Sequence, residues 1–145
     1  MDYIPYLRPS SIEIHQLAIQ KARIIEDGEP CRRYDIFGFF DAVKREITIC
    51  TTRINGHLDP VSIINETLLH EAVHLAQACK TGFKGLSAFG VKTSMMPLSA
   101  SKEASLRAVV AFDRRLSHID REAFFMESRP DLVRYVLKKY CFYES

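Results

Sequence analysis

The residues with the clearest chemical potential form the segment His-Glu-x-x-His, which runs from His70 to His74. Neither proline nor glycine occurs near it, so a helix is expected, and on a helix two residues four apart lie on one face. His70 and His74 can therefore direct their imidazoles at one metal ion, and Glu71 can reach a water molecule bound to that ion. In this pattern the two histidines bind Zn²⁺, and the carboxylate acts as general base and not as ligand.

A third ligand must come from elsewhere in the chain, because catalytic zinc usually has three protein ligands and one position open to water. Glu122 is the preferred candidate: it precedes Ala123 in a predicted helix, and close packing of Ala123 on the motif helix would bring the neighbouring carboxylate to the metal. Glu103 has a similar Glu-Ala pattern, although a glutamate in a first turn is also explained by the helix dipole. His118 is a further alternative, and Glu127 could support the site from outside the ligand set.

The elements that must position the motif can be read from the flanking sequence. Asp59 and Pro60 supply an N-cap and a first-turn proline for the motif helix, which should end near Lys80. Two strands at 34–40 and 43–50, joined by a short turn, predict a β-hairpin in front of that helix. We therefore expect an α+β fold that is mostly helical, with a small antiparallel hairpin packed on the motif helix.

Helices are expected on both sides of this unit. One begins at Ser10, with a capping box formed with Glu13, and its apolar residues continue at helical spacing to Ile25. The segment Gly82–Ser101 has little periodicity, and a loop of that length often lines or covers a site. No repeat or composition change divides the chain, so a single domain over residues 1–145 is predicted. Further helical regions are expected at 102–116, at 119–127 and from 130 onward.

Composition excludes several classes of protein. A hydrophobic fraction of 47% and a charged fraction of 26% are ordinary for a soluble globular protein, and a net charge of +2 gives no case for nucleic-acid binding. No secretory signal is visible, and the polar residues of the motif interrupt the only long apolar run, which excludes a membrane span. The four scattered cysteines are expected to be reduced thiols in a cytoplasmic protein, with a pairing of Cys50 and Cys79 as the alternative.

A resemblance to small minimal zincins covers residues 37–80 and a short piece near Glu122. In such proteins a strand hairpin leads into the active-site helix. The pattern is similar to that of the mitochondrial ATP-synthase-assembly peptidases, although Gln77 stands here where they have an acidic residue. The segment around Glu122 resembles the ligand helix of ImmA/IrrE-type peptidases and of small cyanobacterial and phage HExxH proteins, with Asp120 in place of a glutamate. The resemblance rests on Phe37-Gly38-Phe39-Phe40-Asp41, Ile47-Thr48-Ile49-Cys50, Arg53-Ile54, Glu66 to His74, and Cys79.

This resemblance implies a zinc metallopeptidase that hydrolyses a peptide bond of a restricted protein substrate, with His70, His74 and Glu122 as ligands. Glu71 would be the general base on the zinc-bound water. The group that stabilises the oxyanion stays open, and Asn65 or Glu66 could orient a ligand histidine. The candidates for the oxyanion are His118, Tyr135, Tyr140 and several arginines.

Two other functions are compatible with the same residues. One is a non-catalytic binding or assembly protein, of a phage structural or host-takeover type, in which zinc only stabilises the fold. Glu71 favours the enzyme, because structural coordination of a metal does not need that carboxylate. The other is a zinc amidase that acts on non-peptide substrates.

Overall fold

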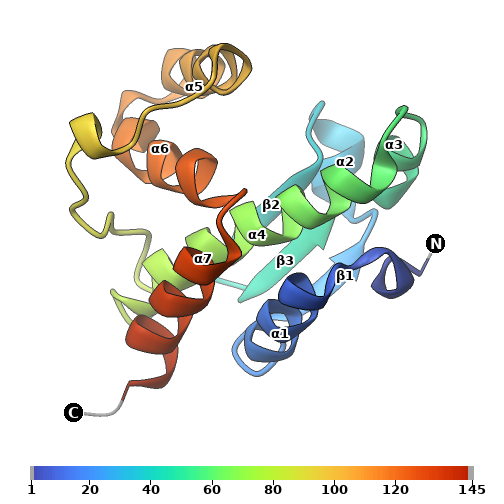
Figure 1. Cartoon of the computed structure of the whole chain (residues 1–145), viewed down its shortest axis with the longest axis horizontal. Helices are drawn as coiled ribbons and strands as arrows, with labels where there is room; N and C mark the ends of the chain where they lie inside the picture. Colours follow the sequence, from blue (N-terminus) through green and yellow to red (C-terminus); the bar gives the residue numbers. More distant parts are fainter. Residues whose placement is uncertain (1, 144–145) are drawn as a thin grey trace.

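The helix that carries the motif, α4 (Pro60–Cys79), runs through the centre of the computed structural model, which describes residues 2–143 (Figure 1). It starts as predicted, because the Asp59 carboxylate accepts a hydrogen bond from the Ser62 amide at 3.2 Å. Its second half is almost entirely buried, so neighbouring elements cover it on all sides. Polar side chains on such a helix need partners within the protein, because burying them without partners is costly.

A three-stranded sheet packs against one side of α4. Its strands are β1 (Arg23–Glu26), β2 (Gly38–Asp41) and β3 (Glu46–Ile49), in the order β1-β3-β2. β2 and β3 form the predicted antiparallel hairpin, and β1 pairs with the other edge of β3 in parallel. The sheet is therefore mixed, with a buried central strand and β2 at one edge.

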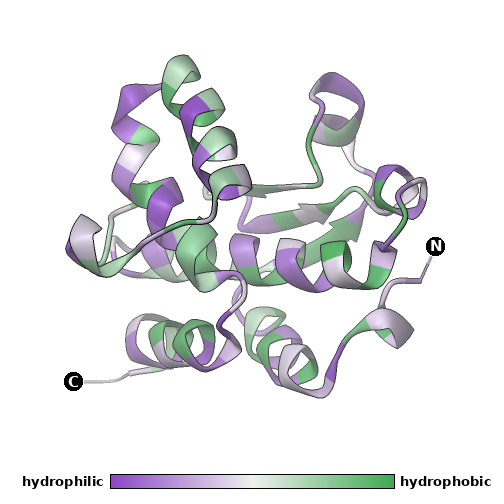
Figure 2. Ribbon diagram, turned by 45° about the horizontal axis from the view of Figure 1, so that its top comes forward, coloured by the Kyte–Doolittle hydropathy of each residue, from purple (hydrophilic) through white to green (hydrophobic). Residues whose placement is uncertain are grey.

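The other long helices are α1 (Pro9–Ala18), α5 (Ala100–Phe112), α6 (Ser117–Met126) and α7 (Pro130–Leu137). α1, α6 and α7 each pack on α4, whereas α5 packs on α6. In Figure 2, α1 and α7 lie below α4, and the sheet and the α5–α6 pair lie above it. The predicted α+β fold, mostly helical with a small sheet on the motif helix, is confirmed. The shorter elements are η1 (Ile4–Tyr6), α2 (Glu29–Arg33), α3 (Thr51–Asn55), η2 (Thr93–Met95), η3 (Arg114–Leu116) and η4 (Lys138–Phe142).

The buried apolar side chains of these helices and strands form one connected core. No helix within residues 2–143 combines the length and the apolar character that crossing a lipid bilayer requires.

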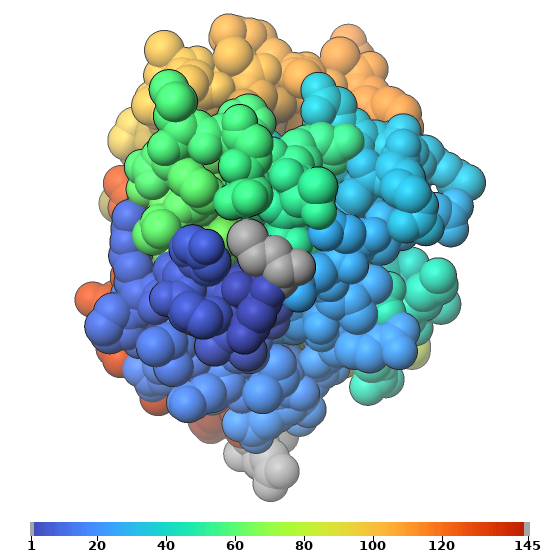
Figure 3. All heavy atoms as spheres, turned by 90° about the vertical axis from the view of Figure 1, so that its right-hand side faces the viewer, coloured from blue at the N-terminus to red at the C-terminus, as the bar shows by residue number. Residues whose placement is uncertain are grey.

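The N-terminal segment is bound to the start of α4 through Asn65. The Asn65 side chain accepts a hydrogen bond from the Arg8 amide at 2.9 Å and donates to the carbonyls of Tyr6, at 3.0 Å, and Val61, at 2.8 Å. In the space-filling view of Figure 3 this segment, in dark blue, lies against the green residues at the start of α4. The structure thus gives Asn65 a role in holding the chain together and does not place it on a ligand histidine.

The region after α1 differs from the prediction. The apolar spacing predicts one helix as far as Ile25, but α1 ends at Ala18 and the chain re-enters the sheet as β1. Ile24 and Ile25 pair with Ile47 and Thr48 of β3, which are buried. β-branched residues favour strands once such a partner is present. Pairing with a strand more than twenty residues away therefore outweighed the local helical spacing.

The four cysteines form two disulfides, Cys31–Cys50 and Cys79–Cys141, so the prediction of reduced thiols is wrong. The alternative pairing of Cys50 with Cys79 is wrong as well. Cys50 lies beside α2, where its Cα atom is 5.5 Å from that of Cys31, and Cys79 meets the C-terminal turn, where the Cα separation from Cys141 is 5.1 Å. Both separations are ordinary for disulfides, and only tertiary folding could select these partners.

Removal of the Cys31–Cys50 disulfide is expected to lower the free energy of unfolding by about 3 kcal/mol, because the bond closes a loop in the unfolded chain. The two cysteines are 19 positions apart. Urea denaturation of the double variant Cys31→Ala/Cys50→Ala, beside the wild type without reductant, measures this difference. A midpoint equal to that of the wild type would contradict the bond.

Candidate metal centre

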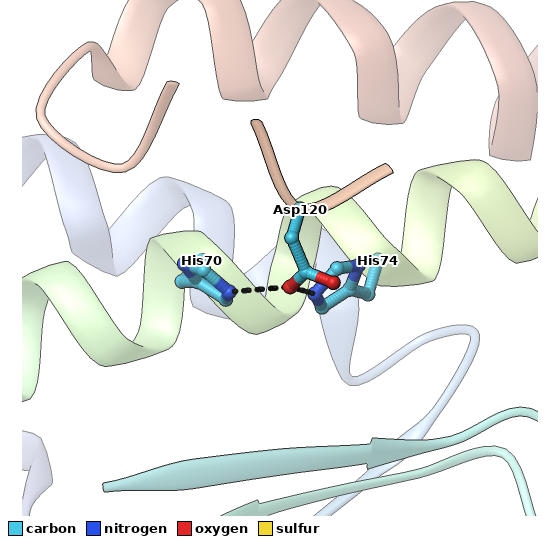
Figure 4. A group of neighbouring side chains, drawn as sticks. All are labelled: His70, His74 and Asp120. Carbon is cyan, nitrogen blue, oxygen red and sulfur yellow. Dashed lines mark ion pairs between the residues drawn. The ribbon is translucent and has the colours of Figure 1, made fainter. Parts of the chain in front are cut away.

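Three potential ligands from two helices meet at one point. His70 and His74 lie one turn apart on α4, and Asp120 lies on α6. Each of the three residues offers one ligand atom, and these three atoms all lie within 4.8 Å of one another. Asp120 Oδ1 is 3.6 Å from His70 Nε2 and 3.3 Å from His74 Nε2, with the carboxylate between the two imidazoles (Figure 4). Ligand atoms about 2.1 Å from a common tetrahedral zinc ion are about 3.4 Å apart, so these separations fit zinc.

The other ring nitrogen of each histidine has its own partner. His70 Nδ1 lies 3.0 Å from Glu127 Oε1, and His74 Nδ1 lies 2.8 Å from Gln77 Oε1. Because both oxygens are acceptors, each Nδ1 carries a proton, so Nε2 is the nitrogen of each imidazole that faces Asp120 and that could bind a metal ion. Metal-binding histidines are commonly oriented in this way by an acceptor on the opposite nitrogen. The donor set and its supports therefore both fit a bound metal ion.

Charge in the site also favours a cation. Burial alone would lower the pKa of His70, but the nearby carboxylates of Asp120 and Glu127, with the charge of Glu71, raise it to about 10. The pKa of Asp120 is lowered: burial opposes this change, but the close contacts with the two imidazoles outweigh it. The carboxyl groups of Asp120, Glu127 and Glu71 thus surround His70 in a buried space, where they stabilise positive charge, whether a proton or a divalent ion carries it.

Glu71 lies next to the first histidine and is buried, with 6% of its surface exposed. Burial is the main reason that its pKa is raised; the histidines act against the shift, and Asp120 and Glu127 add to it. β2 passes very close to it: a Cβ atom added at Gly38 would lie 3.1 Å from Glu71 Oε2 and 2.5 Å from Thr67 Cγ2. The absence of a side chain at Gly38 therefore allows the edge strand to run directly beside the predicted general base.

The predicted third ligand, Glu122, is not at the histidines, where the structure places Asp120 instead. Residues two apart on a helix point about 200° apart, so the two carboxylates project from opposite sides of α6. Glu122 is fully buried and accepts a hydrogen bond from Gln77 Nε2 at 3.0 Å. A signal for Asp120 was present in the sequence: it lies seven residues before Glu127, on the same helical face.

The other predicted site residues have partners of different kinds. Glu103, the second candidate ligand, forms an ion pair with Arg121 at 3.0 Å, on the side of α6 that faces α5. Glu127 takes the supporting position that the sequence suggested for it. Glu66 hydrogen-bonds to Glu127 and thus reaches His70 only indirectly. The supporting role of Gln77 was not foreseen, and its spacing of three residues from His74, adjacent on a helix, was the available signal.

None of the three residues named for the oxyanion lies against the paired histidines. His118 Nε2 is 3.7 Å from Glu122 Oε2, on the side of α6 away from Asp120. Tyr140 stacks on Phe89 with ring centroids 5.0 Å apart, and Tyr135 lies exposed on α7. These three side chains therefore lie in other parts of the structure than the candidate metal centre.

Glu66 gives a pH dependence that can be measured on metal-free protein. Burial, followed by the hydrogen bond and charge of Glu127, raises its pKa to about 7. The folded state then holds a proton that the unfolded chain releases near pH 4.5, so stability from this group is present below pH 4.5 and lost as the pH rises through 7. The unfolding free energy of the wild type should therefore fall more than that of Glu66→Gln when the pH is raised from 5 to 8. After allowance for partial exposure, we expect a difference of about 1 kcal/mol.

Urea denaturation at several pH values tests this expectation, with Glu29→Gln on the exposed surface of α2 as the control. Identical pH profiles for Glu66→Gln and the wild type would contradict the interaction with Glu127.

The chain belongs to the family described as Domain of unknown function (DUF8637), whose profile matches residues 3–142. No curated protein and no solved structure matches the chain. The resemblance to zincins thus stays a prediction that rests on the motif, the hairpin and the candidate metal ligands.

Proposed function

We propose that this member of the DUF8637 family is a zinc metallopeptidase that hydrolyses a peptide bond in a restricted protein or peptide substrate. The observation that carries the proposal is the convergence of His70, His74 and Asp120 beside a buried Glu71. Two imidazoles and a carboxylate form a ligand set that zinc accepts, and three protein ligands leave a coordination position for chemistry.

Each residue has a specific part in the proposed reaction. A zinc ion held by His70, His74 and Asp120 would supply Lewis acidity, which acidifies a water molecule and polarises the scissile carbonyl. Glu71 accepts the proton of the attacking water and then donates it to the leaving amine. The raised pKa of Glu71, caused first by burial, suits a group that must both accept and release a proton. Glu127 and Gln77 hold the two imidazoles in place.

The edge strand β2 is the element that we propose binds the substrate. Among residues 2–143, β3 is the one strand that pairs with β2, and Gly38, the first residue of β2, lies beside Glu71. An extended peptide can add to such an edge through backbone hydrogen bonds, while pockets for alternate side chains give selectivity. A substrate bound in this way would carry its peptide bond past the general base.

The alternative is a non-catalytic assembly protein that binds zinc for stability. Structural zinc sites usually have four protein ligands, whereas the group found in residues 2–143 has three. A buried carboxylate beside an open coordination position favours catalysis. A protein or peptide substrate is therefore the partner that we propose.

The two disulfides bear on where the protein works. Disulfides persist in oxidising environments and are rare in the cytosol of mesophiles. We therefore propose an oxidising compartment in place of the predicted cytoplasmic location. Thiol titration of protein taken from its native cells would test this, and four free thiols per chain would argue for the cytosol.

Metal analysis and a cleavage assay test the proposed function together. Purified protein should contain about one zinc ion per chain and cleave members of a mixed peptide library. Chelation should abolish cleavage, and zinc should restore it. Protein that binds no zinc would refute the proposal, and zinc whose removal unfolds a protein without any cleavage activity would favour the structural alternative.

A further inference from the structure

We propose that Glu122 is a positioning residue that couples the 82–99 loop, the segment between α4 and α5, to the metal ligand His74 through Gln77. This inference rests on the proposed metal centre and extends it, because it names what controls the orientation of one ligand. Glu122, which the sequence predicted as a ligand, would thus act on the metal centre through Gln77 and His74.

The first part of the connection joins Glu122 to the histidine. Gln77 Oε1 lies 2.8 Å from His74 Nδ1, and Gln77 Nε2 donates to Glu122 Oε1 and to the Ile119 carbonyl, each at 3.0 Å. Because the Glu122 carboxylate and the Ile119 carbonyl are both acceptors, the NH₂ group of the Gln77 amide faces them, and its oxygen faces the His74 imidazole. Glu122 therefore helps to select the His74 tautomer that presents Nε2 to the metal.

The second part joins Glu122 to the loop. Its carboxylate accepts hydrogen bonds from three consecutive backbone amides: Phe89 at 2.9 Å, Gly90 at 3.1 Å and Val91 at 3.3 Å. Gly90 has a φ of +92°, a conformation that favours glycine and helps successive amides to converge on one anion. If the loop left this position, a fully buried carboxylate would lose three of its donors, which is unfavourable.

The connection also explains why residue 77 is a glutamine here. A glutamate at that position could still accept the proton of His74 Nδ1. Its second oxygen, however, would face the Glu122 carboxylate and the Ile119 carbonyl, which are both acceptors. With Glu122 bound to the loop, residue 77 must both accept and donate hydrogen bonds, which a glutamine does and a glutamate does not.

The test compares Glu122→Gln with Glu103→Gln, a matched change at a carboxylate that pairs with Arg121 instead. In metal-free protein, amide exchange at residues 89–91 should become at least about 10-fold faster in Glu122→Gln. The ¹⁵N signals of the His74 imidazole should move toward a mixture of tautomers. Zinc affinity, measured by competition with a chelating dye, should fall about 10-fold. Glu103→Gln should resemble the wild type in all three measurements.

Two further variants separate coupling from a general loss of structure. Gln77→Glu alone should lower zinc affinity about 10-fold. The exchange Gln77→Glu/Glu122→Gln should recover part of it, because an amide at position 122 can donate to the carboxylate at position 77, although the Ile119 carbonyl still faces that carboxylate. Phe89→Ala removes the stacking on Tyr140 and loosens the loop without changing Glu122, Gln77 or His74. It should shift the His74 signals in the same direction as Glu122→Gln.

The outcomes distinguish this inference from the proposed function. Faster loop exchange in Glu122→Gln with unchanged His74 signals and zinc affinity would overturn the coupling and leave the peptidase proposal intact. If the wild type binds no zinc, the proposed function fails, but the His74 signals and amide exchange of metal-free protein still decide the coupling. Failure of the exchanged pair to recover affinity would also count against it.

Discussion

Glu71→Gln is expected to retain one zinc ion per chain and to hydrolyse peptides about 10³-fold more slowly than the wild type. Glu71 is not among the three proposed metal ligands, so the amide should leave metal binding intact. It cannot accept the proton of the attacking water, however, and so the chemical step loses its general base. Glutamine has nearly the shape of glutamate, which keeps the close packing against Gly38.

The comparison requires zinc content and kcat measured on the same preparations. Glu29→Gln, an exposed glutamate on α2, is the matched control and should keep wild-type values for both. Unchanged hydrolysis in Glu71→Gln would remove Glu71 from the reaction. Loss of zinc in that variant would instead place Glu71 among the ligands.

Asp120→Ala should weaken zinc binding more than about 10²-fold, which exceeds the effect expected for any residue that only supports a ligand. The variant keeps both histidines but removes the oxygen that lies 3.3 Å from His74 Nε2 and 3.6 Å from His70 Nε2. Hydrolysis should be lost at zinc concentrations that saturate the wild type. The effect should also be larger than that of Glu122→Gln.

Chelator competition with Asp120→Ala, Glu122→Gln and the exposed control Asp131→Ala ranks the carboxylates directly. A greater loss of affinity in Glu122→Gln than in Asp120→Ala would restore Glu122 as the third ligand. It would also require α6 to turn on α4 when metal binds.

The sequence by itself determined the parts of this protein that depend on near neighbours in the chain. Asp59 caps α4, and helical periodicity alone brings His70 and His74 onto one face. The alternation of residues in the hairpin likewise predicted an antiparallel pair, although β2 and β3 are shorter than expected. These features follow from local rules, and the structure agrees with them.

Tertiary structure decided the features that depend on distant partners. β1 is a strand because β3 lies beside it, and the cysteines pair according to which elements meet. The choice between Asp120 and Glu122 is set by the rotation of α6 about its own axis, for which the sequence offers only the shared face of Asp120 and Glu127. The His-Glu-x-x-His segment thus predicted a metal site, and the packing of α6 on α4 places the Asp120 carboxylate beside the two histidines. Glu122 is turned away from them, because a shift of two positions on a helix turns a side chain to the opposite side.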